Sequence, residues 1–174
     1  MVLNERDSRN ERALDVALKM MTAARTAPKG RGLDAVESAV VTGEDILRLS
    51  AEMMRLYELT GKPVYQRDSE NIKNAQAVLL VGTRRNPMGL NCANCGYVTC
   101  GEKPAEVPCA VSSVDVGIAL GSAVAMAADM RVDTRIMFSV GMAAKSLELL
   151  GKGVEQVYGV PVSISSKNPF FDRK

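Results

Sequence analysis

Four cysteines stand within eighteen residues of this chain, and they constrain its fold and chemistry more than any other feature. They are Cys92, Cys95, Cys100 and Cys109, with the spacing C-x2-C-x4-C-x8-C, and the 174-residue chain has no other cysteine and no histidine. Four thiolates in one short segment are the ligand set of an iron–sulfur cluster or of a tetrahedral zinc ion. We therefore predict a metal-binding loop over residues 84–109.

The spacing of these cysteines favours a cluster over zinc. Zinc sites commonly present two CxxC pairs or include histidine, whereas this chain has one CxxC pair and no histidine. Disulfides are typical of small secreted domains, and a redox-active CxxC pair would leave Cys100 and Cys109 without a role. The sequence predicts one [4Fe–4S] cluster, with structural zinc as the alternative.

Composition excludes several classes of function. A net charge of +2, 4% aromatic residues and no tryptophan argue against a nucleic-acid surface. The longest uncharged apolar run in a helical region, residues 116–128, is shorter than the roughly twenty residues that span a membrane. The charged N-terminus does not resemble a secretory signal, so we expect a cytoplasmic protein. Without histidine, an enzyme of this sequence would depend on a cofactor for its chemistry.

Apolar periodicity predicts alternating helices and strands in one domain over residues 1–174. The helices are expected over 11–28, 42–61, 69–75, 113–131 and 142–150. The strands are expected over 38–41, 77–81, 135–140 and 156–164. This order predicts an α+β fold in layers, with a sheet of about four strands. The helix over 113–131 is narrow because glycine and alanine dominate it, and we expect it to be central and closely packed on all sides.

A basic turn follows the first helix and is a second candidate site. Arg25, Lys29 and Arg31 could bind an anion through charge-assisted hydrogen bonds, and Gly30 leaves backbone amides accessible. Solvated turn residues are the alternative interpretation. The sequence leaves both open.

Four segments of the chain resemble the flavin-binding nitroreductases. They are residues 19–45 (KMMTAARTAPKGRGLDAVESAVVTGED), 71–83 (NIKNAQAVLLVGT), 114–141 (VDVGIALGSAVAMAADMRVDTRIMFSVG) and 157–164 (VYGVPVSI). The resemblance implies a mixed sheet packed with helices around a central apolar helix. It also implies a homodimer and flavin mononucleotide (FMN), whose phosphate Arg25, Lys29, Gly30 and Arg31 would hold.

A narrower resemblance is to small prokaryotic proteins described as ferredoxin-domain-containing. The C-x2-C-G-x3-C motif over residues 92–100 and the GIALGSA helix over 117–123 carry it. It implies a [4Fe–4S] protein that acts in electron transfer or as a small flavin-linked oxidoreductase. The partner would be a redox protein or a small-molecule electron acceptor. A zinc-stapled interaction domain without catalysis is the alternative, and whether the protein is an enzyme stays open.

Overall fold

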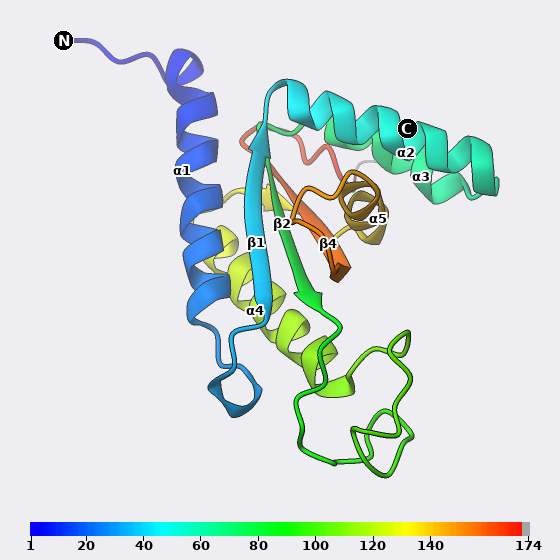
Figure 1. The fold of residues 1–174 in the computed structure, drawn as a ribbon. Helices are drawn as coiled ribbons and strands as arrows, with labels where there is room; N and C mark the ends of the chain where they lie inside the picture. The colour runs from blue at the N-terminus through cyan, green and yellow to red at the C-terminus, as the bar shows by residue number, and fades with distance from the viewer. Residues whose placement is uncertain (172–174) are drawn as a thin grey trace.

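The computed structural model describes residues 1–171, which contain five α-helices, four strands and one short 3₁₀ turn (Figure 1). The helices are α1 (Glu5–Thr26), α2 (Glu44–Thr60), α3 (Pro63–Ile72), α4 (Ala110–Asp129) and α5 (Phe138–Ser146), and the 3₁₀ turn is η1 (Gly30–Gly32). The strands are β1 (Val36–Thr42), β2 (Ala77–Arg84), β3 (Asp133–Thr134) and β4 (Val154–Ser163).

The strands form one sheet in the order β1-β2-β4-β3, and each pair is antiparallel. The fold class is as expected, but the strand directions differ from the expected mixed sheet. The helical hairpin is the reason: α2 and α3 lie side by side and run in opposite directions, so they return the chain to the end of the sheet where β1 finished (Figure 1). A single crossover helix would have given parallel strands.

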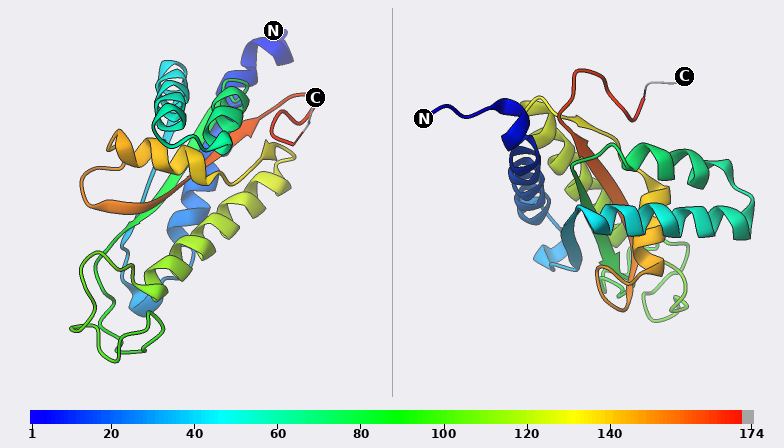
Figure 2. Two further views of the ribbon diagram at one scale, coloured as in Figure 1. Left: turned by 90° about the vertical axis from the view of Figure 1, so that its right-hand side faces the viewer. Right: turned by 90° about the horizontal axis from the view of Figure 1, so that it is seen from above.

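Helices cover both faces of the sheet, which makes three layers (Figure 2). Leu79 and Val81 of β2 pack against α1 and α4 on one face. Val78 and Leu80 alternate with them and pack against α2 and α5 on the other face. Because successive side chains of a strand point to opposite faces, this continuous apolar run serves two cores at once.

The strand expected over 135–140 is wrong. Only β3 and an isolated bridge between Met137 and Gly159 extend the sheet here, and α5 begins at Phe138. Short apolar runs fit a strand or a buried helix equally well by periodicity. A long-range contact determines that this segment is helical. Gly141 lets α5 approach β4 so closely that an added Cβ would lie 1.8 Å from the Val157 carbonyl oxygen.

Several helix boundaries also differ from those expected. The first helix begins at Glu5 rather than near residue 11, because the Asn4 side chain accepts a hydrogen bond from the Arg6 amide and caps it. The third begins at Pro63, a residue well suited to the first turn of a helix. The second is preceded by Gly43, whose φ is positive (55°), rather than capped by Thr42.

Helix α4 is buried on one side only, which corrects the expectation that it is packed all round. Its buried stripe includes Val116, Ala119 and Ala123 and faces α1 and the sheet. On the other side Val114 is 58% exposed and Ile118 40%. By length and composition alone α4 is apolar enough to cross a membrane. Its buried side, however, packs against α1 and the sheet as the core helix of a globular domain does.

Candidate metal centre

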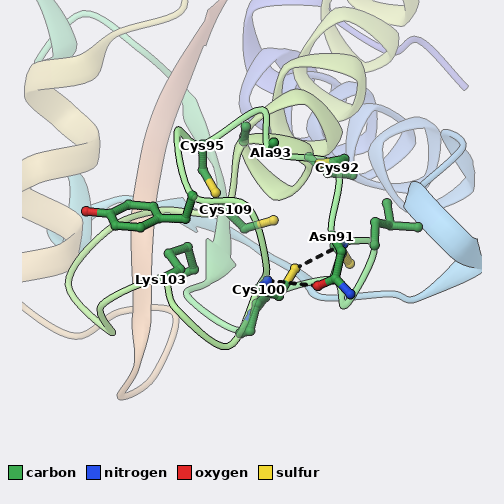
Figure 3. Close-up of a pocket in the computed structure, with 13 residues that line it drawn as sticks. Asn91, Cys92, Ala93, Cys95, Cys100, Lys103 and Cys109 are labelled. Atoms are coloured by element: carbon green, nitrogen blue, oxygen red, sulfur yellow. Dashed lines mark hydrogen bonds between the residues drawn. The ribbon is translucent and has the colours of Figure 1, made fainter.

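All four cysteines belong to the segment between β2 and α4, which contains no helix or strand. They are free thiols: Cys92 is exposed, Cys95 and Cys100 are partly buried, and Cys109 is buried. Together they line one small cavity of about 10 Å³. Figure 3 shows the sulfur atoms of Cys95, Cys100 and Cys109 directed into the space between them. The structure therefore brings the four cysteines together around one cavity, and their role as metal ligands stays a prediction.

Cys109 is the most firmly held of the four. It is the N-cap of α4, so its sulfur lies beside the free amides of the first helical turn. Burial raises the pKa of this thiol, but the nearby amides of Ser112, Met88 and Val111 and the Ser112 hydroxyl outweigh burial and hold the pKa below its ordinary value. The surroundings of Cys109 thus favour a thiolate, the form that binds metal.

Cys100 is held by a reciprocal pair of bonds with Asn91 (Figure 3). The Asn91 amide donates to Cys100 Sγ at 3.4 Å, and Asn91 Oδ1 accepts from the Cys100 amide at 2.8 Å. Asn91 and Ala93, on either side of Cys92, both have positive φ, as does Gly96. Positive φ is unfavourable for residues with a Cβ, so the chain here is strained around Cys92 in a way typical of binding sites.

The spacing of the ligands bears on which metal fits. Within residues 1–171, no three His, Cys, Asp or Glu side chains are arranged so that they could hold a single metal ion. A zinc ion would need its sulfur ligands at about 2.3 Å from one point. Four thiols around one cavity are also the donor set of an iron–sulfur cluster, which cysteine thiolates hold at its corners.

A buried hydroxyl near the cavity also fits a sulfur-rich group. The Ser112 side chain is 1% exposed, and its oxygen has no hydrogen-bond partner of good geometry within the described chain. This hydroxyl lies near Cys109, where a thiolate or an inorganic sulfide could accept a hydrogen bond from it. The donor set and this free hydroxyl both suit a cluster.

Two cations of the basic turn are engaged with the protein's own oxygens. Arg25 donates to the Asp34 carboxylate at 2.6 Å and to the Val36 carbonyl at 2.7 Å. Lys29 donates to the Ala24 carbonyl at 2.8 Å, at the end of α1. Burial lowers the pKa of Lys29. These two side chains therefore stabilise the exit from α1.

The rest of the basic turn contacts the cysteine loop and α4. The Gly30 amide donates to both carboxylate oxygens of Asp115, at 2.9 and 3.0 Å. Arg31 donates to the Met88 carbonyl at 2.7 Å, and Met88 lines the cavity of the four cysteines. The two sites predicted separately from the sequence are thus neighbours at one end of the molecule (Figure 2). The FMN phosphate site itself stays a prediction.

Sequence reasoning missed four contributors to the site: Met88, Asn91, Lys103 and Ser112. Asn91 carries a weak signal, because asparagine tolerates positive φ and stands directly before the first cysteine. Met88, Lys103 and Ser112 carry none, since their roles depend on how the loop folds back on α4.

The fold is shared with solved flavoproteins of low sequence identity. A nitroreductase with bound FMN from Desulfitobacterium hafniense is 17% identical, with a TM-score of 0.63 over 88% of this chain and 78% of that one. A nitroreductase family protein from Clostridium novyi has a TM-score of 0.58 at 15% identity, over 86% and 73%. A BluB-like flavoprotein from Clostridium difficile has 0.54 at 17%, over 88% and 81%. The nitroreductase-like fold expected from the sequence is confirmed.

The sequence itself has a much nearer relative. A protein of Archaeoglobus fulgidus described as "Uncharacterized protein" is 41% identical over 183 aligned positions, which cover 99% of this chain and 98% of the relative. Residues 105–173 match the family described as "Uncharacterized protein containing a ferredoxin domain" (DUF2148). That match includes Cys109 and α4 but not the first three cysteines. The chain therefore belongs to this ferredoxin-domain family, and its fold is that of the nitroreductase-like flavoproteins.

Proposed function

We propose that this protein binds one [4Fe–4S] cluster through Cys92, Cys95, Cys100 and Cys109 and transfers electrons. The observation that carries the proposal is the cavity lined by all four free thiols. The ferredoxin domain in the family description and the redox proteins that share the fold support the same class of function.

The residues around the cavity would do two kinds of work. The four thiolates would ligate iron, and the cluster, when bound, would supply one-electron transfer. The Asn91 amide donates to the sulfur of Cys100, and nearby amides hold the pKa of Cys109 low, so both sites favour negative charge on sulfur and would tune the potential of a bound cluster. Cys92 is exposed, so the cluster would approach the surface on its side, where a redox protein or small electron acceptor could reach it.

Iron and sulfide analysis after anaerobic purification tests this proposal. We expect a brown protein with iron and sulfide in equal amounts, bleached by dithionite. Replacing Cys109 or Cys100 by serine should remove most of the iron, and Val98→Ala, a change at a residue of the same loop that is 73% exposed, serves as the control. A colourless protein that contains zinc would instead establish the alternative, a zinc-stapled domain without redox chemistry.

FMN is the second cofactor that we propose, at Arg25, Lys29, Gly30 and Arg31. The contact of this turn with the cysteine loop favours it, because a flavin held there would lie near the cluster. The protein would then be a small FMN-dependent oxidoreductase. Titration with FMN tests the site: the double variant Arg25→Ala, Arg31→Ala should bind on the order of a hundredfold more weakly, since charge-assisted bonds contribute about 1.5–3 kcal/mol each. No binding by the wild type would remove flavin from the proposal.

Assembly and location complete the proposal. We place the protein in the cytoplasm, where thiols stay reduced. We also propose a homodimer that covers the exposed face of α4, because Val114 and Ile118 there stand among small residues that allow a second helix to come close. A stable dimer would bury at least about 1,000 Å² in total.

A further inference from the structure

One charged side chain lines the cavity of the four cysteines, and it is a cation. Lys103 is only 9% exposed, and it is the single charged residue among the 13 that line the cavity (Figure 3). It comes from the loop itself, three residues after Cys100. The lining contains no aspartate or glutamate.

The partners of Lys103 leave its charge uncompensated. Its ammonium group donates to the Val107 carbonyl at 2.6 Å and to the Pro104 carbonyl at 3.1 Å. Both acceptors are neutral, and no ion pair found within residues 1–171 includes Lys103. Lysine is almost never buried without a paired anion, because removing the charge from water is costly. The site therefore lacks a negative partner for this cation.

We propose that Lys103 is the counter-ion of the metal centre and raises the reduction potential of the cluster. The inference rests on the proposed function. A cluster with four thiolate ligands carries net negative charge, and the cavity gives it one buried cation as a neighbour. The bonds to Pro104 and Val107 hold the ammonium group in place, so its charge acts from a fixed position.

The sign of the effect follows from electrostatics. Reduction transfers one electron to the cluster, [4Fe–4S]²⁺ + e⁻ → [4Fe–4S]⁺, with dithionite as the electron donor in the experiment below, and no bond is made or broken. The reduced site has one more negative charge, so a nearby cation stabilises it more than the oxidised site. Burial strengthens this interaction because water screens it less. Net charge is one of the recognised determinants of cluster potential.

The experiment compares midpoint potentials of anaerobically prepared Lys103→Gln, Lys103→Arg and wild type, followed by the EPR signal of the reduced cluster. In K103Q we expect the ratio of reduced to oxidised cluster at a fixed potential to fall about tenfold, a shift of about 59 mV to lower potential for one electron. K103R keeps the charge and should stay near the wild type. Lys62→Gln is the control, because it removes an exposed lysine from the turn between α2 and α3.

Each outcome bears on a different proposal. A wild type that binds no iron contradicts the proposed function itself. Equal potentials in K103Q and wild type, or the same shift in K62Q, overturn the role of Lys103 and leave the cluster standing. If K103Q does not retain iron, K103R decides between the two roles of the lysine. Iron retained by K103R at the wild-type potential supports the role of the charge. Loss of iron from both variants shows that Lys103 has a purely structural role.

Discussion

Gly141 occupies the tightest contact between a helix and the sheet. A Cβ at this residue would lie 1.8 Å from the Val157 oxygen, which is backbone and cannot move aside. We predict that Gly141→Ala lowers the free energy of unfolding by about 3 kcal/mol, at the upper end of overpacking effects. Gly117→Ala is the matched control: nothing lies within 4 Å of its added Cβ, and alanine favours the helix by about 1 kcal/mol. Urea denaturation followed by circular dichroism measures both, and a stable G141A would contradict the close approach.

Single residues also show how far sequence reasoning reaches. The cysteines could be chosen as ligands because their chemistry and spacing are local properties, and the structure brings them to one cavity. Lys103 could not be distinguished from a solvated lysine, because its burial results from the fold of the whole loop. The sequence identifies Arg31 as a cation, yet its hydrogen bond to Met88, 57 positions away, is not visible in the sequence.

Asp115 joins the turn η1 to α4, and this joint can be tested. Both of its oxygens accept from the Gly30 amide, and the side chain is 3% exposed. Asp115→Asn should destabilise the protein by about 2 kcal/mol, because the bond from the Gly30 amide loses its charge assistance and the new side-chain NH2 of asparagine is a buried donor without an acceptor. Asp129→Asn, at the exposed end of the same helix, should change stability by less than about 0.5 kcal/mol. Equal effects of the two changes in thermal melting would contradict the role of Asp115.

Helices α2 and α5 are connected by a carboxylate whose ionisation makes stability depend on pH. Hydrogen bonds from Arg55 hold the pKa of Glu52 below its ordinary value of 4.5, although burial raises it, and the Ser146 hydroxyl of α5 also lowers it. The stabilisation is therefore complete above pH 4.5 and is lost as the pH falls through the lower pKa of the folded state.

Glu52→Gln should accordingly flatten the acid side of the stability profile of the purified protein. Glu58→Gln removes an exposed carboxylate from the same helix and is the control. Denaturant midpoints measured from neutral pH down to the acid transition provide the test. A profile of E52Q that falls as steeply as the wild type below pH 4.5 would count against this assignment.

Among the helices and strands, those whose ends carry clear sequence signals were predictable. Gly61 ends α2 in a left-handed conformation, as the Gly-Lys-Pro stop indicated. The apolar run of β2 indicated a buried strand. The region after α4 misled because its apolar residues lack a clear period, and only the bridge between Met137 and Gly159 shows where the sheet ends and α5 begins.

At the scale of the whole molecule, the exposed face of α4 tests the proposed dimer. Ile118→Arg places a charge in the centre of that face and should convert dimers to monomers, because an unpaired charge cannot be buried there. Leu59→Arg is the control, since Leu59 is 67% exposed at the far end of α2. Light scattering at micromolar concentration reports the mass. A monomeric wild type, or a dimer unaffected by I118R, would exclude this interface.

The layered fold was predictable as a class, whereas the strand directions were not. Alternating helices and strands indicate layers, but direction depends on whether one helix or two connect neighbouring strands. The predicted short helix at 69–75 is in fact the end of α3, which begins at Pro63 and pairs with α2. Because the length of this helix was underestimated, the sequence did not indicate the helical hairpin that makes β1 and β2 antiparallel.

The position of β2 between two cores has a consequence for the timing of local opening. Its amide hydrogens are bonded to β1 on one side and β4 on the other, so they exchange with solvent chiefly when the entire domain unfolds. The cysteine loop begins directly after this strand and has few backbone bonds of its own. Its amides can therefore exchange without disturbing the sheet. Hydrogen exchange should therefore show two classes of amide. Those of the layered body exchange slowly, and those of residues 85–108 exchange fast until a bound ligand orders the loop.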